Sequence, residues 1–227
     1  MRFDVQELDG GVTPVDVDID AVVIGGWTGR DAAAVQHHID ELAEIGVPGP
    51  SKTPLYYRVG ADLLTQAEHI QTVGDGGSGE VEAVLIASRE GLLVGVGSDH
   101  TDRKAEAWSV ALSKQLCPKP IGRQAWRLAD VLGHWDEIML QSAQERDGAT
   151  VEYQNGALSA CRRPEDIVER YTGDGALAVG TALFLGTIPV IGELKGGDAF
   201  AMRLVDTANG GRTLDHAYRV EVLPVVV

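Results

Sequence analysis

The sequence contains few of the residues that characterise several common protein classes. It has only two cysteines, Cys117 and Cys161, and no Cys-x-x-Cys pair, which argues against a disulfide framework or a structural zinc site. Basic residues are also scarce, because 19 Lys and Arg stand against 34 Asp and Glu and give a formal net charge of −15. Since nucleic-acid-binding surfaces are basic, we expect no nucleic-acid partner and little affinity for anionic membranes.

Long apolar segments are missing as well. The longest uncharged run is GALAVGTALFLGTIPVIG, residues 175–192, and it is interrupted by four glycines and Pro189. We interpret it as a buried strand followed by a turn and not as a membrane-spanning helix. The first ten residues, MRFDVQELDG, have no apolar core of the kind found in secretion signals. We therefore expect a cytoplasmic protein with no membrane partner.

The patterns that are present indicate one strand-rich domain. Apolar residues make up 44% of the chain, which supports a packed core. We find no repeat and no linker, so we expect residues 1–227 to form a single α+β domain with a few helices at its edges. Alternating or continuously apolar segments predict strands, and apolar residues at helical spacing predict helices. The predicted strands include 15–25, 54–59, 177–186, 198–206 and 214–224, and the predicted helices are 29–46, 101–116, 125–142 and 164–171.

Two hairpins are predicted in addition. In residues 149–162, Asn155-Gly156 suits a tight two-residue turn. In residues 79–103, the turn is expected at Glu90-Gly91, which would put Glu82 directly opposite Asp99. Glu80 shares the face of Glu82, because side chains two residues apart on a strand point the same way. The second hairpin therefore brings three carboxylates to one end of an otherwise apolar ribbon.

Three carboxylates on one face of a sheet repel one another and need compensation. A hard divalent cation such as Mg²⁺ or Mn²⁺ supplies it, because these ions prefer oxygen ligands in octahedral geometry and keep open positions for a substrate. The sequence thus predicts a metal site at Glu80, Glu82 and Asp99. The alternative is a solvated sheet edge that holds no ion.

Four stretches, taken in order, resemble the fumarylacetoacetate hydrolase superfamily, through a bacterial branch of unknown function. Residues 80–86, EVEAVLI, are similar to its ExE strand, and residues 98–122 resemble its ND-x-S-x-RD stretch with the Lys-Ser and CP-x-G turn that follow. Residues 21–59 resemble its first strand, helix and P-x-F-x-K segment, and residues 180–205 resemble its LTGTP-x-GV…GD segment. The resemblance implies a mixed β-roll fold.

The resemblance also implies roles for individual residues. It assigns Glu80, Glu82 and Asp99 as ligands of Mg²⁺ or Mn²⁺, in agreement with the hairpin argument. By the same resemblance, Lys114 helps to bind a substrate oxygen, and Thr187 contacts substrate. Arg58 stands where the family commonly has lysine; a guanidinium there suits bidentate binding of a substrate carboxylate, and simple solvent exposure of Arg58 is the alternative. A catalytic dyad that activates water would be His38 and Glu41, whose spacing matches the family loosely; a surface ion pair between them is the alternative.

These roles predict an enzyme that acts on a small keto acid or β-dicarbonyl compound. The leading reaction is hydrolytic or lyase cleavage of a C–C bond through a metal-stabilised enolate, and the resemblance implies a homodimer. Decarboxylation, hydration or tautomerisation on the same metal site is the first alternative. A metal-binding protein without catalysis, or a scaffold whose carboxylate patch stays empty, is the second.

Overall fold

The computed structural model describes residues 1–44 and 49–224, except for the side chains of His38 and of residues 41–44. In this part of the chain a mixed sheet of nine strands has the order β2-β1-β11-β9-β8-β14-β3-β4, with β5 paired to β11. Its strands are β1 (Arg2–Gln6), β2 (Val12–Asp16), β3 (Ala21–Gly26), β4 (Leu55–Val59), β5 (Leu64–Thr65), β8 (Val81–Ser88), β9 (Gly91–Ser98), β11 (Lys119–Arg127) and β14 (Thr181–Phe184).

A second sheet packs against the first. Its order is β13-β12-β15-β16-β6, and β6 runs parallel to β16 while the other neighbours are antiparallel. Alternate residues of β15 are buried, as expected for a sheet with one face on the core and one in solvent. The strands are β6 (His69–Val73), β12 (Met139–Arg146), β13 (Ala149–Ala157), β15 (Ala199–Asp206) and β16 (Arg212–Leu223).

The core lies on both faces of the first sheet. On one face Val81 and Val96 pack with Met202 and Leu214 of the second sheet. On the other face, side chains from strands far apart in the sheet order form one cluster, with Phe3 of β1 and Val59 of β4 as members. The first sheet is therefore rolled around its own side chains. This arrangement explains why β8 is buried along its whole length and reads as an apolar run.

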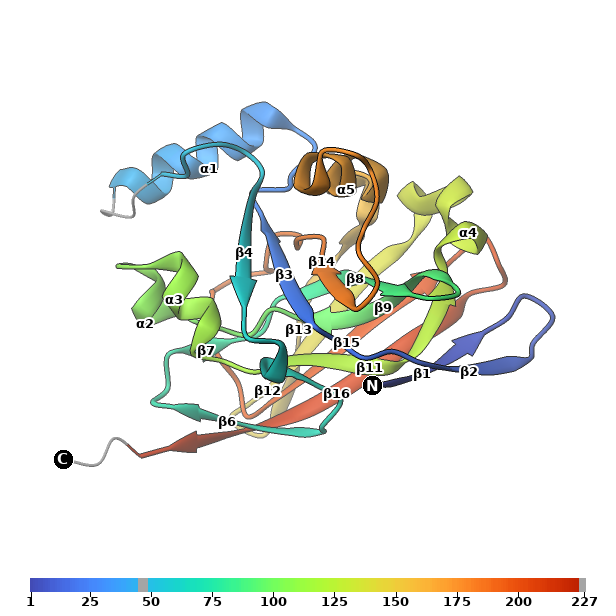
Figure 1. Ribbon diagram of the computed structural model, residues 1–227. Coiled ribbons are helices and arrows are strands. Elements are labelled where there is room, and N and C mark those ends of the chain that lie inside the picture. Colours follow the sequence, from blue (N-terminus) through green and yellow to red (C-terminus); the bar gives the residue numbers. More distant parts are fainter. Residues whose placement is uncertain (45–48, 225–227) are drawn as a thin grey trace.

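The helices lie around the sheets and do not form a layer of their own (Figure 1). They are α1 (Ala32–Glu44), α2 (Arg103–Glu106), α3 (Val110–Gln115), α4 (Leu128–Val131) and α5 (Pro164–Thr172). Short 3-10 turns cover Ala61–Leu63, Leu132–Glu137 and Leu158–Ala160. Two further short strands, β7 (Gly77–Ser78) and β10 (Thr101–Asp102), pair beside α2. The α+β, strand-rich β-roll with peripheral helices is confirmed.

Several local predictions need correction. The helix predicted for 125–142 is wrong, because β11 continues to Arg127 and β12 begins at Met139, with only short helical turns between them. The turn predicted at Asn155-Gly156 is also wrong, because both residues lie inside β13. The hairpin turns instead at Asp147-Gly148, whose φ angles of 51° and 77° belong to a tight primed turn.

The apolar run 175–192 contains β14 followed by a turn, as predicted. Among the described residues no helix has the length and hydrophobicity needed to cross a membrane.

Candidate metal centre

The β8–β9 hairpin carries the three carboxylates, but its register differs from the predicted one. The turn is Arg89-Glu90, so Ser88 faces Gly91 and Glu82 faces Gly97. Asp99 follows β9 and donates its backbone N–H to the carbonyl oxygen of Glu80 at 3.0 Å. The register is shifted by two residues, and a shift of two keeps every side chain on its original face. The convergence of the three acids is therefore retained.

The three side chains form a compact set of oxygen donors. Glu80, Glu82 and Asp99 each offer a carboxylate oxygen, and these oxygens lie within 4.8 Å of one another. Asp99 and Glu82 are buried, with 0% and 2% exposure, and Glu80 is partly buried. Buried carboxylates this close together cannot all stay ionised without positive charge beside them. The cluster therefore calls for cations, from the protein or from a metal.

Glu82 is held in place by the turn after β14. The backbone N–H of Gly186 donates to Oε2 of Glu82 at 2.7 Å. Gly186 has a φ of +96°, and a Cβ built on it would lie 1.7 Å from Oγ1 of Thr28. Only glycine permits this close approach together with this backbone conformation. The glycine therefore brings a backbone donor to a buried ligand candidate.

Protein cations surround the cluster. Lys114, 5% exposed, donates a hydrogen bond from Nζ to Oδ2 of Asp99. Lys119, fully buried, has its Nζ 3.3 Å from Oδ1 of Asp99. Nη2 of Arg103 lies 3.1 Å from Oε1 of Glu80. Three positive groups thus accompany three carboxylates, which gives a partial alternative to a metal as the source of compensating charge.

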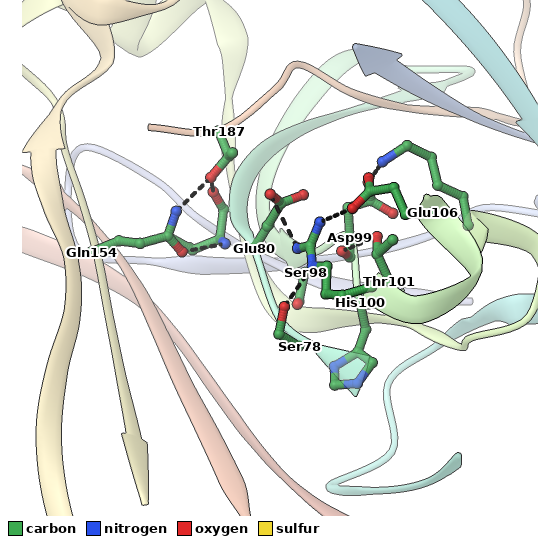
Figure 2. A network of polar contacts seen from close by, with 12 residues as sticks. Ser78, Glu80, Ser98, Asp99, His100, Thr101, Glu106, Gln154 and Thr187 are labelled. Atoms are coloured by element: carbon green, nitrogen blue, oxygen red, sulfur yellow. Dashed lines mark hydrogen bonds and ion pairs between the residues drawn. The ribbon is translucent and has the colours of Figure 1, made fainter. Parts of the chain in front are cut away.

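A fourth acidic residue, Glu106, shares the positive charge of Arg103. Nη1 of Arg103 donates to Glu106 at 2.9 Å, and its Nε donates to Ser78 at 2.7 Å. Glu80 and Glu106 lie apart in Figure 2, and the guanidinium of Arg103 contacts both of them. Because Glu106 shares the charge of Arg103, the site as a whole keeps a surplus of negative charge.

The pKa values follow from these neighbours. Burial raises the pKa of Glu82 well above its ordinary value, and the charges of Asp99 and Glu80 raise it further. Burial also raises the pKa of Glu80. Burial acts in the same direction on Asp99, but Lys114 and Lys119 outweigh it and lower the pKa of that carboxyl. Asp99 and Lys114 therefore form an ionised pair, whereas Glu82 takes up a proton more readily than a free glutamate.

The donors present fit a hard divalent cation. All three are carboxylates, the ligand type that Mg²⁺ and Mn²⁺ prefer. Oδ1 of Asp99 is buried and accepts no hydrogen bond from the described residues, and the ammonium of Lys119 lies 3.3 Å from it. Asp102, near these ligands, instead caps α2 by accepting from the N–H groups of Lys104 and Ala105 at 2.9 and 3.0 Å.

The other predicted site residues have different relations to this cluster. Lys114 joins it directly, and its Nζ also lies 5.9 Å from the ring centroid of Tyr57. Thr187 lies next to it, where its hydroxyl donates to the carbonyl oxygen of Val81 at 2.7 Å. Arg58 is exposed and starts on the opposite face of β4 from Tyr57, so the structure does not bring it to the cluster.

The predicted dyad falls on α1. The side chains of His38 and Glu41 lie outside the described residues, and their role stays a prediction.

Three residues that belong to the cluster or its support were not predicted. Arg103 and Lys119 lie within the stretch 98–122 that carries the family resemblance, and their positive charge beside Asp99 is the signal that points to them. Gln154 reaches the site from the second sheet, and no spacing in the sequence indicates it.

Comparison with solved structures finds several chains of the same fold. Cg1458 matches with a TM-score of 0.65 and 15% identity over 93% of this chain and 80% of that one. Yeast ynq8, a fumarylacetoacetate hydrolase family protein, matches with a TM-score of 0.63 and 17% identity over 92% and 95%. A 2-keto-3-deoxy-D-arabinonate dehydratase, complexed with magnesium and 2,5-dioxopentanoate, matches with a TM-score of 0.63 and 15% identity over 96% and 79%.

Among curated proteins no match was found. The likeness to the solved structures, at 15–17% identity, concerns the fold, and it agrees with the resemblance drawn from the motifs. Residues 25–218 match the family DUF2848, described as "Protein of unknown function (DUF2848)". The chain therefore belongs to this family of unknown function, and it has the fold of fumarylacetoacetate hydrolase family proteins.

Proposed function

We propose that this protein is a divalent-metal-dependent enzyme that acts on a small keto acid or β-dicarbonyl compound. The observation that carries the proposal is the convergence of Glu80, Glu82 and Asp99 at the end of one buried hairpin. These residues would hold Mg²⁺ or Mn²⁺. When bound, such a metal supplies Lewis-acid polarisation of a substrate oxygen.

Lys114 is the residue best suited to assist the chemistry. Its ammonium is buried beside Asp99, and Asp99 and Glu80 raise its pKa against the opposing effect of burial, so it stays charged. A fixed positive charge at this position stabilises negative charge that develops on a substrate oxygen. Cleavage of a C–C bond is the reaction we favour, with His38 and Glu41 activating water and with Thr187 binding substrate.

Dehydration or hydration is the second candidate reaction. The dehydratase that shares this fold is complexed with magnesium and 2,5-dioxopentanoate, a small dicarbonyl compound. A site that withdraws electrons from a carbonyl serves elimination of water and C–C cleavage alike. Product analysis separates them, because cleavage yields two smaller molecules whereas dehydration removes only water.

The test measures metal binding and turnover in the same samples. We expect the protein to bind Mn²⁺ in a calorimetric titration, and Mn²⁺ to raise its melting temperature, because a ligand that binds only the folded state stabilises it. A panel of acylpyruvates, oxaloacetate and other β-dicarbonyl compounds should include one that is consumed. Chelator and Glu82→Ala should each abolish binding and turnover.

Glu90→Ala is the matched control, because Glu90 lies at the turn of the same hairpin with an exposed side chain. It should leave both properties unchanged. Metal binding without turnover of any compound in the panel would favour a non-catalytic metal-binding protein. If the protein does not bind Mn²⁺, the positive charges of Arg103, Lys114 and Lys119 alone compensate the negative charge of the cluster.

The proposal also covers the oligomeric state, cellular location and domain organisation of the enzyme. We propose a homodimer located in the cytoplasm, on the strength of the family resemblance and the sequence features given above. We further propose that residues 1–227 act as one domain, which is supported by a core that both sheets share. Light scattering on the purified protein measures the mass that decides between monomer and dimer.

A further inference from the structure

On the edge that faces β14, β8 loses its neighbouring strand close to the ligand candidates Glu80 and Glu82. β14 pairs with β8 as far as Phe184 and Val84, and the backbone N–H of Leu185 then donates to the carbonyl oxygen of Ala83 at 3.0 Å. At Gly186 the chain turns away with a φ of +96°. The next peptide groups of β8 on this edge belong to Val81, and no strand of the described residues continues to pair them. Buried backbone groups of this kind need other partners.

Two side chains take the place of the missing strand. Oε1 of Gln154 accepts the backbone N–H of Val81 at 3.0 Å, and Oγ1 of Thr187 donates to the carbonyl oxygen of Val81 at 2.7 Å. Nε2 of Gln154 donates to Oγ1 of Thr187 at 2.7 Å, which links the two side chains to each other. Figure 2 shows Gln154 and Thr187 joined in this way beside Glu80.

The amide of Gln154 has no freedom to rotate. The residue is fully buried, and besides the two contacts above its Nε2 donates to the carbonyl oxygen of Ile188 at 2.7 Å. Its Oε1 also accepts from the hydroxyl of Ser142 at 3.0 Å. Two donor and two acceptor positions are therefore all occupied, which is the full capacity of a glutamine side chain. Gln154 belongs to β13 and Ser142 to β12, so the second sheet fixes this amide.

The residue held in this way separates the two glutamates. The N–H of Val81 is part of the planar peptide that joins it to Glu80, and its carbonyl is part of the peptide that joins it to Glu82. Fixing both planes fixes the backbone dihedrals of Val81. The directions in which the side chains of Glu80 and Glu82 leave the strand are then fixed as well.

We propose that Gln154 and Thr187 are positioning residues that set the geometry of the Glu80–Glu82 ligand pair through the two peptide groups of Val81. This inference rests on the proposed function, because it assigns the pair to a divalent metal. It gives the hydroxyl of Thr187 a structural task that is separate from contact with substrate. Removing groups that orient metal ligands typically weakens metal binding by about 10- to 100-fold.

The experiment uses four variants and the wild-type chain. Gln154→Leu removes the amide, Thr187→Val removes the hydroxyl at constant shape, and Thr187→Ser restores the hydroxyl. Gln144→Leu is the matched control, because Gln144 is a buried glutamine of the same sheet whose Oε1 accepts from Arg146 at 2.7 Å. Two quantities are measured: Mn²⁺ affinity by calorimetry, and the hydrogen-exchange rate of the Val81 amide in metal-free protein.

We expect Gln154→Leu and Thr187→Val to weaken Mn²⁺ binding by about 10- to 100-fold. Gln154→Leu should also accelerate exchange at Val81. Thr187→Ser and Gln144→Leu should bind Mn²⁺ like the wild type. Since Thr187→Val keeps the amide of Gln154 and a side chain of the same shape, it provides the test even where Gln154→Leu does not fold.

Three outcomes would overturn the inference. In the first, exchange at Val81 accelerates while Mn²⁺ affinity stays at the wild-type level. In the second, Thr187→Val raises KM for substrate and leaves Mn²⁺ affinity unchanged, which is the behaviour of a substrate contact alone. In the third, Gln144→Leu weakens Mn²⁺ binding as much as Gln154→Leu. A wild-type chain that binds no Mn²⁺ is a separate result, because it contradicts the proposed function before any variant is compared.

Discussion

Asp99 lies between two buried lysines, Lys114 and Lys119. Lys119 also donates hydrogen bonds to the backbone. Nζ of Lys119 donates to the carbonyl oxygens of His100, Lys114 and Cys117 at 2.6, 2.5 and 3.0 Å, in addition to its approach to Asp99. One ammonium therefore joins the segment after β9 to the end of α3. This contact explains how the ligand candidate and Lys114 come to lie side by side.

Replacing Lys119 by Met keeps the apolar stem and removes the ammonium. We expect a loss of about 3–5 kcal/mol in the free energy of unfolding, because the change leaves three buried carbonyl oxygens without their donor and removes one of the two cations beside Asp99. Lys104→Met is the control, since Lys104 pairs with Asp75 where both side chains are largely exposed, and it should change stability little. Urea unfolding of both variants measures the difference. Equal stability of the two would contradict the role given to Lys119.

The residues of the site differ in how far the sequence alone identifies them. Glu80, Glu82 and Asp99 were predicted because alternation along a strand fixes which side chains share a face, whatever the exact turn. Lys114 was predicted only through a family resemblance, and Lys119 was not predicted. Gln154 was beyond sequence reasoning, because it is 73 positions away from Val81 and reaches it only through the packing of two sheets.

At the scale of elements, strands with continuous apolar runs were predicted well and irregular connections were not. Residues 125–142 have apolar side chains at helical spacing, yet Trp126, Val131, Trp135 and Ile138 are all buried in one cluster while the backbone passes from strand to short turns and back. The spacing of Val131, Trp135 and Ile138 fits one continuous helix, but here short helical turns and an adjoining strand bury the same side chains. Tertiary packing, and not the local pattern of apolar residues, therefore determines the secondary structure of this segment.

The turn between β12 and β13 can be tested by substitution of its glycine. Gly148 has a φ of 77°, and the structure places no atom within 4 Å of a Cβ built there, so Gly148→Ala is costly only because of its backbone conformation. We expect a loss of about 1–2 kcal/mol in the free energy of unfolding. Gly133→Ala is the control, because Gly133 has equally open space and no positive φ, and it should be neutral or stabilising. Thermal melts compare the two, and a neutral Gly148→Ala would argue for a different turn.

For the whole molecule, the second sheet braces both strands of the site hairpin. Gln154 supports Val81 of β8, and the hydroxyl of Tyr218 lies 2.8 Å from Oγ of Ser98 at the end of β9. The same hydroxyl lies 3.0 Å from Nδ1 of His100. The carboxylate cluster is thus built on one sheet and held by the other. Its geometry depends on how the two sheets pack, which no short stretch of the sequence encodes.

A second polar cluster also joins the two sheets. Asp206, buried at the end of β15, accepts from Arg212 at 2.9 Å and from the amide of Asn209 at 2.9 Å. Nε2 of His134 lies 2.8 Å from its other oxygen. Arg212 extends to the carbonyl oxygen of Gln6 in β1 at 3.3 Å. Burial alone would raise the pKa of Asp206, but Asn209 and Arg212 outweigh it and lower the pKa below its ordinary value.

This shift predicts how the stability of the whole fold depends on acid. Because the folded-state pKa of Asp206 is below its unfolded value of about 3.9, the carboxylate stabilises the protein fully above that pH and ceases to do so as pH falls through the folded pKa. Asp206→Asn removes this contribution. Its melting temperature should therefore lie below that of the wild type at pH 5–7, and the gap should narrow below about pH 4. Asp9→Asn is the control, because Asp9 is exposed and accepts only from Gly11 among the hydrogen bonds of the described residues. A gap for Asp206→Asn that stays constant from pH 3 to pH 7 would mean that ionisation of Asp206 does not hold the sheets together.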